Sequence, residues 1–199
     1  MTFTSGYGTS QSGRIGTYEG GRILDGPALM SPDFVYRYTL RRTVSLIGGG
    51  RCLFIMLNPS TADARINDPT IRRCMGFAQR WGYAELMVAN LFAYRSTDPA
   101  ELREADDPVG EHNDQAITGL AALADVVICA WGNAGALAYR DLAVLDLLAA
   151  AGADQPRTAA LAINATSRHP KHPLYARADC DPIPWGRRDA DLAARAVIA

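Results

Sequence analysis

An unbroken apolar run that ends in a proline turn is the feature that most constrains this chain of 199 residues. The run is Leu53-Phe54-Ile55-Met56-Leu57, and Asn58-Pro59-Ser60-Thr61 follows it directly. A run of this length without polar alternation predicts a strand buried on both faces, and Asn-Pro stops it abruptly. The first polar side chains therefore stand at the carboxyl end of the strand, where open α/β sheets place their ligands.

Strands and helices are predicted to alternate along the rest of the chain. Apolar runs predict further strands at 85–89, 125–130 and 158–163. Helical spacing predicts helices at 68–82, 111–123 and 136–151, followed by a short C-terminal helix. Such alternation is typical of a parallel sheet with helices on both faces. We therefore predict an α/β fold: a three-layer α/β/α arrangement with a mainly parallel four-stranded central sheet.

The N-terminal part has a different pattern. Residues 1–20 are rich in Gly, Ser and Thr, which predicts a flexible tail before a single domain at 21–199. Apolar and polar residues alternate over 34–41, which is typical of a half-buried strand. Gly48-Gly49-Gly50 supplies a turn into the apolar run, which predicts an antiparallel hairpin at the edge of the sheet.

Composition excludes several classes of protein. The net charge of −1 argues against dense, sequence-blind coating of nucleic acid. No apolar run approaches the ~18 residues of a membrane span, and the N-terminus does not have the order of a signal peptide, so we expect a cytoplasmic protein with no membrane partner. Four widely separated cysteines predict reduced thiols, with no metal and no cofactor. The oligomeric state stays open.

Polar side chains follow each predicted parallel strand and should meet at one edge of the sheet. This edge is rich in amides and hydroxyls and poor in carboxylates, which suits recognition of a neutral, hydrogen-bonding ring. Asn58 either forms the turn or positions a water molecule, and Asn90 either caps its strand or pairs with the edge of a base. The side chains concerned lie at Asn58–Thr61, at Asn90 with Tyr94 and Arg95, at Trp131–Asn133 and at Asn164–Tyr175.

Two histidines, His169 and His172, each precede a proline in the last of these segments. A metal site is disfavoured because no Cys, Asp or Glu lies between Ser167 and Tyr175 to complete a coordination shell. Two interpretations remain for these histidines. Either one of them has a hydrogen-bonding or cationic role in a site, or it is a solvent-exposed loop residue. Basic residues outnumber acidic ones over 157–188, with Arg168 and Lys171 among them, and this excess either meets phosphates or forms a solvated face. The segment 97–154 is strongly acidic.

Four motifs together resemble a bacterial family known only as domain-of-unknown-function family 1643. They are Met56-Leu57-Asn58-Pro59-Ser60-Thr61-Ala62-Asp63, Asp68-Pro69-Thr70-Ile71-Arg72-Arg73-Cys74, Asn90-Leu91-Phe92-Ala93 and His169-Pro170-Lys171-His172-Pro173-Leu174-Tyr175. The resemblance covers about residues 28–185 and implies no activity.

The order of the motifs is also similar to that in the uracil-DNA glycosylase superfamily. The resemblance implies that Asn58 assists water attack and that Asn90 reads the base. It also implies that a His-Pro histidine lies in a loop that enters the minor groove. The chain departs from the superfamily: Met56 stands where Gly is expected, the cysteines of the iron–sulfur branch are missing, and no aromatic residue follows Pro59. Phe92 and Trp131 are then the candidates for stacking on the base.

These observations lead to a hypothesis with two rivals. The chain is expected to bind a nucleic acid or nucleotide substrate and to hydrolyse the N-glycosidic bond of a uracil-like or modified base. The rivals are a non-catalytic nucleotide or nucleic-acid sensor, and an N-glycosidase or transferase for free nucleosides or nucleotides. The predicted catalytic residues are Asn58, His169 and His172, and the predicted substrate-binding residues are Pro59, Ser60, Thr61, Asn90, Phe92, Arg95, Trp131, Arg168, Lys171 and Tyr175.

Overall fold

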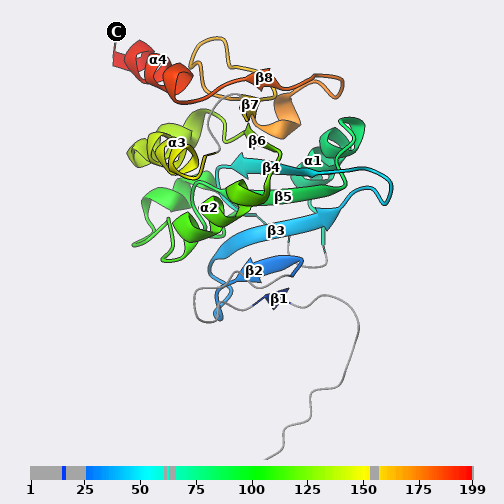
Figure 1. Cartoon of the computed structure of the whole chain (residues 1–199). Helices are drawn as coiled ribbons and strands as arrows, with labels where there is room; N and C mark the ends of the chain where they lie inside the picture. Colours follow the sequence, from blue (N-terminus) through cyan, green and yellow to red (C-terminus); the bar gives the residue numbers. More distant parts are fainter. Residues whose placement is uncertain (1–14, 17–25, 61, 63–65, 153–156, 199) are drawn as a thin grey trace, which may run out of the picture.

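The computed structural model describes residues 15–16, 26–60, 62, 66–152 and 157–198. They form one eight-stranded sheet with the order β1-β2-β3-β5-β4-β6-β7-β8, which runs from the bottom to the top of Figure 1. The strands are β1 (Ile15–Gly16), β2 (Ala28–Met30), β3 (Arg37–Thr43), β4 (Arg51–Met56), β5 (Glu85–Asn90), β6 (Val126–Cys129), β7 (Thr158–Ala160) and β8 (Ile183–Pro184).

Strands β5, β4, β6 and β7 are parallel, which agrees with the predicted parallel centre. The sheet is larger than predicted because β1, β2 and β3 extend it on one side and β8 on the other. Of the predicted tail, only residues 15–16 are described, and they pair with β2.

The predicted antiparallel hairpin is wrong. β3 is antiparallel to its neighbour, but that neighbour is β5, which lies between β3 and β4. The connection after β3 bonds to the segment that leads into β5: the backbone N–H of Val44 donates to Ala84 and that of Gly49 donates to Gly82. The glycine turn therefore carries the chain across β5 and does not fold β4 back onto β3.

β3 is also not half-buried, because its first four residues, Arg37–Leu40, are buried on both faces. Phe34 and Val35 lie outside the strand, and Phe34 has a φ of 62° in a turn closed by its N–H bond to the oxygen of Ser31.

The helices are α1 (Pro69–Arg80), α2 (Asn113–Leu123), α3 (Arg140–Ala150) and α4 (Arg187–Ile198), with short 3-10 helices η1 (Pro99–Arg103), η2 (Asn133–Tyr139) and η3 (Pro173–Tyr175). The predicted start of α1 is confirmed: Asp68 Oδ1 accepts the N–H of Ile71 at 2.8 Å, and Pro69 is the first helical residue. The predicted helix over 136–151 is shorter, because Ala138 and Tyr139 adopt left-handed conformations that separate η2 from α3.

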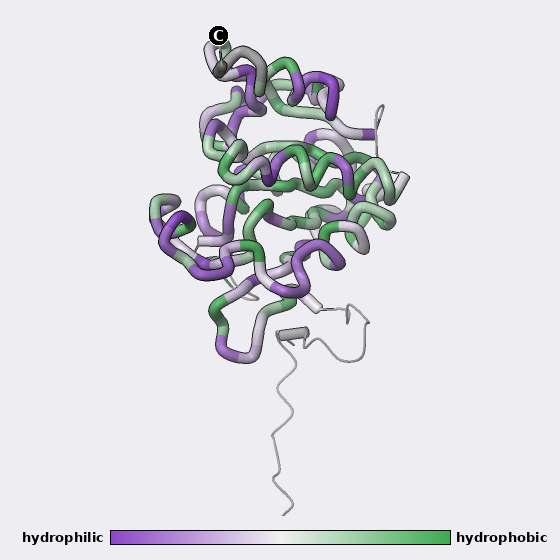
Figure 2. The backbone as a smooth tube through the Cα atoms, turned by 90° about the vertical axis from the view of Figure 1, so that its left-hand side faces the viewer, coloured by the Kyte–Doolittle hydropathy of each residue, from purple (hydrophilic) through white to green (hydrophobic). Residues whose placement is uncertain are grey.

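Two apolar cores enclose the sheet, which gives the three layers. Alternate residues of β4 divide between them: Leu53 and Ile55 pack toward α2 and α3, whereas Cys52 and Phe54 pack toward α1. The α1 side carries an aromatic stack, with the rings of Phe54 and Trp81 centred 6.2 Å apart. Figure 2 shows the apolar central strands as green segments through the middle of the molecule.

The predicted state of the cysteines agrees with the structure. All four are free thiols; Cys52, Cys74 and Cys129 are buried and Cys180 is partly exposed. Burial raises the pKa of each of the three buried thiols, which keeps them protonated and unreactive. None of the described helices meets the length and hydropathy needed to cross a membrane.

Candidate functional site

A cavity of about 410 Å³ opens at the carboxyl edge of the parallel strands. This size suits a small organic ligand. Its walls come from six parts of the chain: β3, the turn after β4, the start of α1, the loop after β5, the segment after β6 and the segment after β7. The lining residues are Arg37, Met56–Asn58, Ser60, Asp68, Thr70, Ile71, Ser96, Thr97, Pro99, Trp131–Ala134, His172 and Tyr175.

Asn58 is half-buried on the cavity wall, and both hydrogens of its amide nitrogen are committed to the backbone. Its Nδ2 donates to the backbone oxygen of Ser96 at 2.9 Å and to that of Pro59 at 3.2 Å. The Nδ2 group must therefore face these two carbonyl oxygens, which fixes the orientation of the amide. Its Oδ1 is left as a hydrogen-bond acceptor.

The structure separates the two histidines. His172 lines the cavity, where its Nδ1 accepts the N–H of Leu174 at 3.4 Å and its ring lies 5.9 Å from that of Tyr175. Burial lowers the pKa of His172, while Asp68 partly opposes this shift, so the imidazole is neutral at pH 7. Because Nδ1 accepts, the neutral ring carries its proton on Nε2.

His169 lies in the interior and does not line the cavity. Its Nδ1 is 3.6 Å from Asp141 Oδ2 at the start of α3, and both side chains are almost completely buried. Burial raises the pKa of Asp141, while its hydrogen bond from the Leu142 N–H and the nearby His169 act in the opposite direction. His169 Nδ1 has no hydrogen-bond partner within the described chain, so the two side chains meet by close packing, which brings the loop that carries His172 against α3.

Asn90 is 1% exposed and does not form part of the cavity wall. Its Oδ1 accepts from Arg37 Nη2 at 3.2 Å, and Arg37, which lines the cavity, also donates to the backbone oxygen of Ala62 at 2.7 Å. Asn90 is thus one residue behind the wall. Its Nδ2 has no hydrogen-bond partner within the described parts of the chain.

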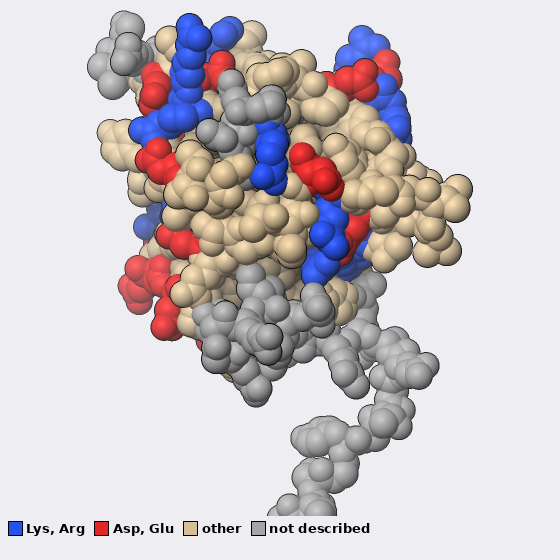
Figure 3. Space-filling view, in the orientation of Figure 1, with Lys and Arg blue, Asp and Glu red and all other residues tan. Residues whose placement is uncertain are grey.

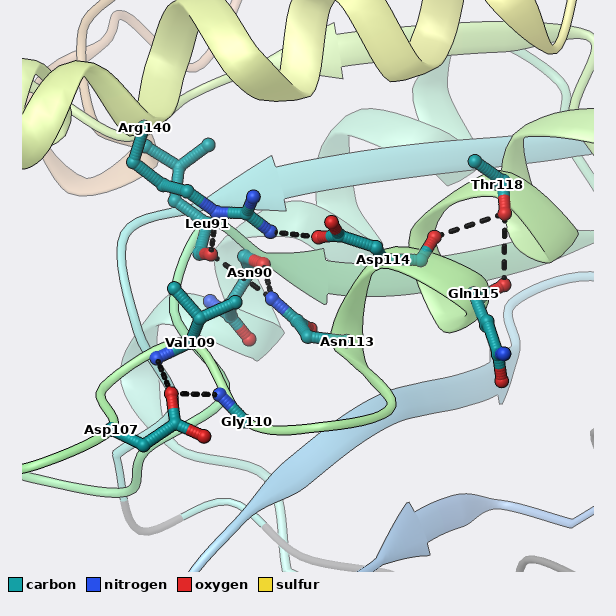
Figure 4. Close-up of polar contacts among 10 residues, drawn as sticks. All are labelled: Asn90, Leu91, Asp107, Val109, Gly110, Asn113, Asp114, Gln115, Thr118 and Arg140. Carbon is teal, nitrogen blue, oxygen red and sulfur yellow. Dashed lines mark hydrogen bonds and ion pairs between the residues drawn. The ribbon is translucent and has the colours of Figure 1, made fainter.

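A buried polar network extends from Asn90 toward α2 and α3 (Figure 4). Asn113 Nδ2 donates to the backbone oxygens of Asn90 and Leu91, at 3.1 and 3.0 Å. Arg140 also donates to the Leu91 oxygen and is ion-paired with Asp114. These contacts fix the backbone at the end of β5, immediately behind the cavity.

Trp131 is the aromatic candidate that reaches the cavity. Trp131 is 2% exposed and also belongs to the core on the α2 and α3 side, where its ring meets that of Trp185 edge-on at 5.5 Å. It also packs closely on Gly135, where an added Cβ would lie only 2.0 Å from Trp131 Cδ1. Phe92, the second candidate, is packed in the core beneath α2 and α3. Tyr175 is 78% exposed and stands at the mouth.

The remaining predicted site residues divide in the same way. Ser60 lines the cavity, whereas Pro59 is buried beside it. Arg95 bonds to the backbone oxygen of Phe34, away from the cavity, and neither Arg168 nor Lys171 lines it. Thr61 lies outside the described residues. Within the described residues, no group of three or more His, Cys, Asp or Glu side chains could hold a metal ion.

The sequence interpretation placed Asn133 at this edge but missed five other polar residues of the wall, which are Arg37, Asp68, Thr70, Ser96 and Thr97. A signal for Arg37 was present, because an arginine between Tyr36 and Tyr38 in a buried strand needs polar partners. Asp68 was taken as a helix cap alone. Asn133 Oδ1 accepts from Asn164 Nδ2 and Ser167 Oγ, a contact that depends on loops 31 and 34 residues away.

The fold and the cavity define an α/β protein with a small-molecule-sized site, lined by apolar and polar side chains, at the carboxyl edge of its parallel strands. The family model "Protein of unknown function (DUF1643)" matches residues 37–174, which is more than half of the chain, so the protein belongs to this family. The matched residues include β3 to β7, which carry or precede the segments that line the cavity. Neither the curated proteins nor the solved structures that were compared yielded a match.

Proposed function

We propose that the cavity binds a nucleobase and that the protein hydrolyses the N-glycosidic bond of that base. The observation that carries the proposal is the fixed amide of Asn58. A side chain that only formed a turn would not need its Nδ2 held by two backbone oxygens while its Oδ1 remains available beside a cavity. The motif order shared with the uracil-DNA glycosylase superfamily supports the same assignment.

In this mechanism Asn58 positions the attacking water. Its Oδ1 accepts a hydrogen bond from the water and holds it against the sugar carbon, which supplies orientation and not proton abstraction, because an amide is not a base at pH 7. The water oxygen forms a bond to the sugar carbon, the C–N bond breaks and its electron pair leaves with the base. The proton of the water is released to solvent or to the departing base.

His172 stabilises the base as it leaves. A neutral imidazole with its proton on Nε2 is a hydrogen-bond donor, and the charge of a departing base develops on its ring oxygens or nitrogens. We assign this role to His172 and not to His169, because only His172 lines the cavity.

The base is held by the remaining wall. Trp131 supplies an aromatic surface, and the guanidinium of Arg37 supplies donors held in place by Asn90. Asn90 therefore acts in this proposal by positioning Arg37, which revises the expectation that it reads the base directly.

The proposal is tested by base release from oligonucleotides containing uracil, hypoxanthine, xanthine or a hydroxymethylpyrimidine, as single and double strands. We expect an abasic product from at least one. If none of these substrates is cleaved and the corresponding free nucleosides are also stable, the hydrolase proposal fails.

A free nucleoside or nucleotide is the second candidate substrate, and the charge of the wall favours it. Arg37 is the one Lys or Arg among the lining residues, and it is 2% exposed, so the described mouth carries no basic side chain that could follow a phosphate backbone. Salt dependence separates the two substrates. Oligonucleotide binding through phosphates weakens steeply between 50 and 200 mM salt, on the order of tenfold per few phosphate contacts, whereas nucleoside binding does not.

A further inference from the structure

A second cavity, of about 560 Å³, lies between the turn that joins β2 to β3 and the loop that leads into α2. It shares no lining residue with the first cavity. Its chemically distinctive wall residues are Asp33, Tyr36, Tyr38, Asp107, Glu111 and His112. Aromatic rings and carboxylates thus surround one space.

The aromatic part of the wall is ordered. The rings of Tyr36 and Tyr38 are nearly parallel, with centroids 6.1 Å apart, and His112 lies 5.6 Å from Tyr38. Gly110, with a φ of +84°, passes so close that an added Cβ would lie 2.8 Å from Tyr36 and 3.2 Å from Tyr38. The backbone of Gly110 therefore packs directly against both rings.

The environment of Tyr38 indicates that the cavity binds a ligand. Its side chain lines the cavity although the residue is only 4% exposed, and its hydroxyl has no hydrogen-bond partner among the described residues. Tyr36, by contrast, donates from its hydroxyl to the backbone oxygen of Asp107 at 2.9 Å. The Tyr38 hydroxyl is not one of the fully buried polar atoms that have no partner, so it opens onto the cavity, where a ligand can form a hydrogen bond with it.

Two of the three carboxylates are fixed by hydrogen bonds, and the third, Glu111, lies 3.9 Å from His112 Nε2, where it forms an ion pair only when His112 is protonated. Asp33 Oδ1 accepts from Ser31 Oγ and the Val35 N–H, and Asp107 Oδ1 accepts from the N–H groups of Val109 and Gly110. No Lys or Arg lines the cavity within the described chain. Figure 3 shows Asp and Glu side chains gathered at the lower left of the molecule, where the loop between β5 and α2 lies.

We infer that this cavity binds an organic cation, an ammonium or guanidinium group, against the tyrosine rings. Such a group is attracted by aromatic faces and by carboxylates, and it can donate to the Tyr38 hydroxyl oxygen. The wall carries three carboxylates, Asp33, Asp107 and Glu111, against a single histidine, so the site has an excess of negative charge that the cation neutralises. The cation belongs either to a free polyamine or to the side chain of a peptide.

Isothermal titration calorimetry with two probes tests this site and distinguishes these sources. Spermidine represents the free polyamine, and N-acetyl-arginine methylamide represents the peptide side chain, with the neutral citrulline analogue as its isosteric control. We expect at least one cationic probe to bind and the citrulline analogue not to bind. Preference for spermidine identifies a polyamine site, and preference for the arginine probe identifies a peptide site.

Substitutions of the wall residues test whether the probes bind in this cavity. The double variant Asp33→Asn/Asp107→Asn keeps the oxygens that accept the backbone N–H groups but removes the charge, and it should weaken binding at least about tenfold. Tyr38→Phe keeps the ring and should weaken binding about threefold. Asp179→Asn, whose carboxylate is paired with Arg177 elsewhere on the surface, is the control.

Three results would overturn the inference. The first is that neither cation binds at 10 mM, a concentration on the order of the weakest specific affinities. The second is that the citrulline analogue binds as well as the arginine probe, and the third is that the double variant keeps both the wild-type affinity and the wild-type melting temperature. All the measurements are independent of base release, so they stand whether or not the proposed hydrolase activity is found.

Discussion

The side-chain amide of Asn58 donates to the backbone oxygen of Ser96 over 2.9 Å, and this bond ties the turn after β4 to the loop after β5. The two segments form adjacent parts of the cavity wall, since Asn58 and Ser96 both line it. The contact therefore serves two purposes: it joins these two parts of the wall and it orients Asn58 Oδ1.

The substitution Asn58→Asp should destabilise the protein at neutral pH. A carboxylate oxygen would replace the Nδ2 donor and face the carbonyl oxygens of Ser96 and Pro59. We expect a loss of about 1–3 kcal/mol in the free energy of unfolding, measured by urea denaturation at pH 7. The loss should shrink at pH 4, where a protonated carboxyl can donate. Gln79→Glu, at an exposed position of α1, is the matched control, and equal stability of the two variants would contradict the assigned orientation of the amide.

The substitution Gly135→Ala should disturb the cavity through Trp131. The new Cβ would lie 2.0 Å from Trp131 Cδ1 and 2.5 Å from its Nε1, so the indole must move. We expect a destabilisation of about 1–3 kcal/mol together with a changed tryptophan fluorescence spectrum. Gly76→Ala is the control, because nothing lies within 4 Å of its added Cβ and α1 should gain about 0.5–1 kcal/mol. A Gly135→Ala protein with the stability and spectrum of the wild type would show that Trp131 is not held as described.

His172 should give the protein a stability that decreases in mild acid. Because burial lowers the pKa of folded His172 below the unfolded value of about 6.5, the unfolded chain binds the proton more readily. The free energy of unfolding therefore falls as the pH drops from about 6.5 to the folded pKa, and the loss is complete below it. His172→Gln should remove this part of the pH dependence in urea titrations from pH 8 to pH 5. An NMR titration in which His172 protonates above pH 6.5 would contradict the prediction.

The two histidines should differ sharply when each is replaced by alanine. His169→Ala leaves Asp141 buried without its neighbour, which should cost about 3 kcal/mol. His172→Ala removes a half-buried ring at the cavity and should cost less than about 1 kcal/mol. Thermal unfolding separates the two outcomes; equal shifts in melting temperature would argue against an interior role for His169.

The parallel centre of the sheet was predictable because local patterns determine it. Long apolar runs such as 53–57 and the Asp68-Pro69 helix start depend on residues close in sequence, and the structure agrees with both. The pairing of β3 was not predictable in the same way. An alternating segment next to a glycine turn favours a hairpin locally, but β5 offers β3 an open edge that only the assembled sheet provides.

The sequence predicted that the site lies at the carboxyl edge of the parallel strands, but it did not predict which side chains contact one another there. The rule that parallel strands end together brought Asn58, Ser60, Trp131, His172 and Tyr175 to one cavity. It could not separate His169 from His172, because the choice depends on Asp141 from α3. It also could not show that Arg37 stands in front of Asn90, since β3 reaches that position only by pairing with β5.

The most direct test of the proposed function is a single-turnover comparison of wild-type protein, Asn58→Ala and Gln79→Ala on whichever uracil-like or modified substrate the wild type cleaves. Base release and substrate affinity are measured on the same samples. We predict that Asn58→Ala slows base release by about a hundredfold or more, as loss of an orienting group does, while its affinity stays within about threefold of the wild type and Gln79→Ala is unchanged. Base release by Asn58→Ala at the wild-type rate would contradict the assignment of Asn58 as the group that positions water.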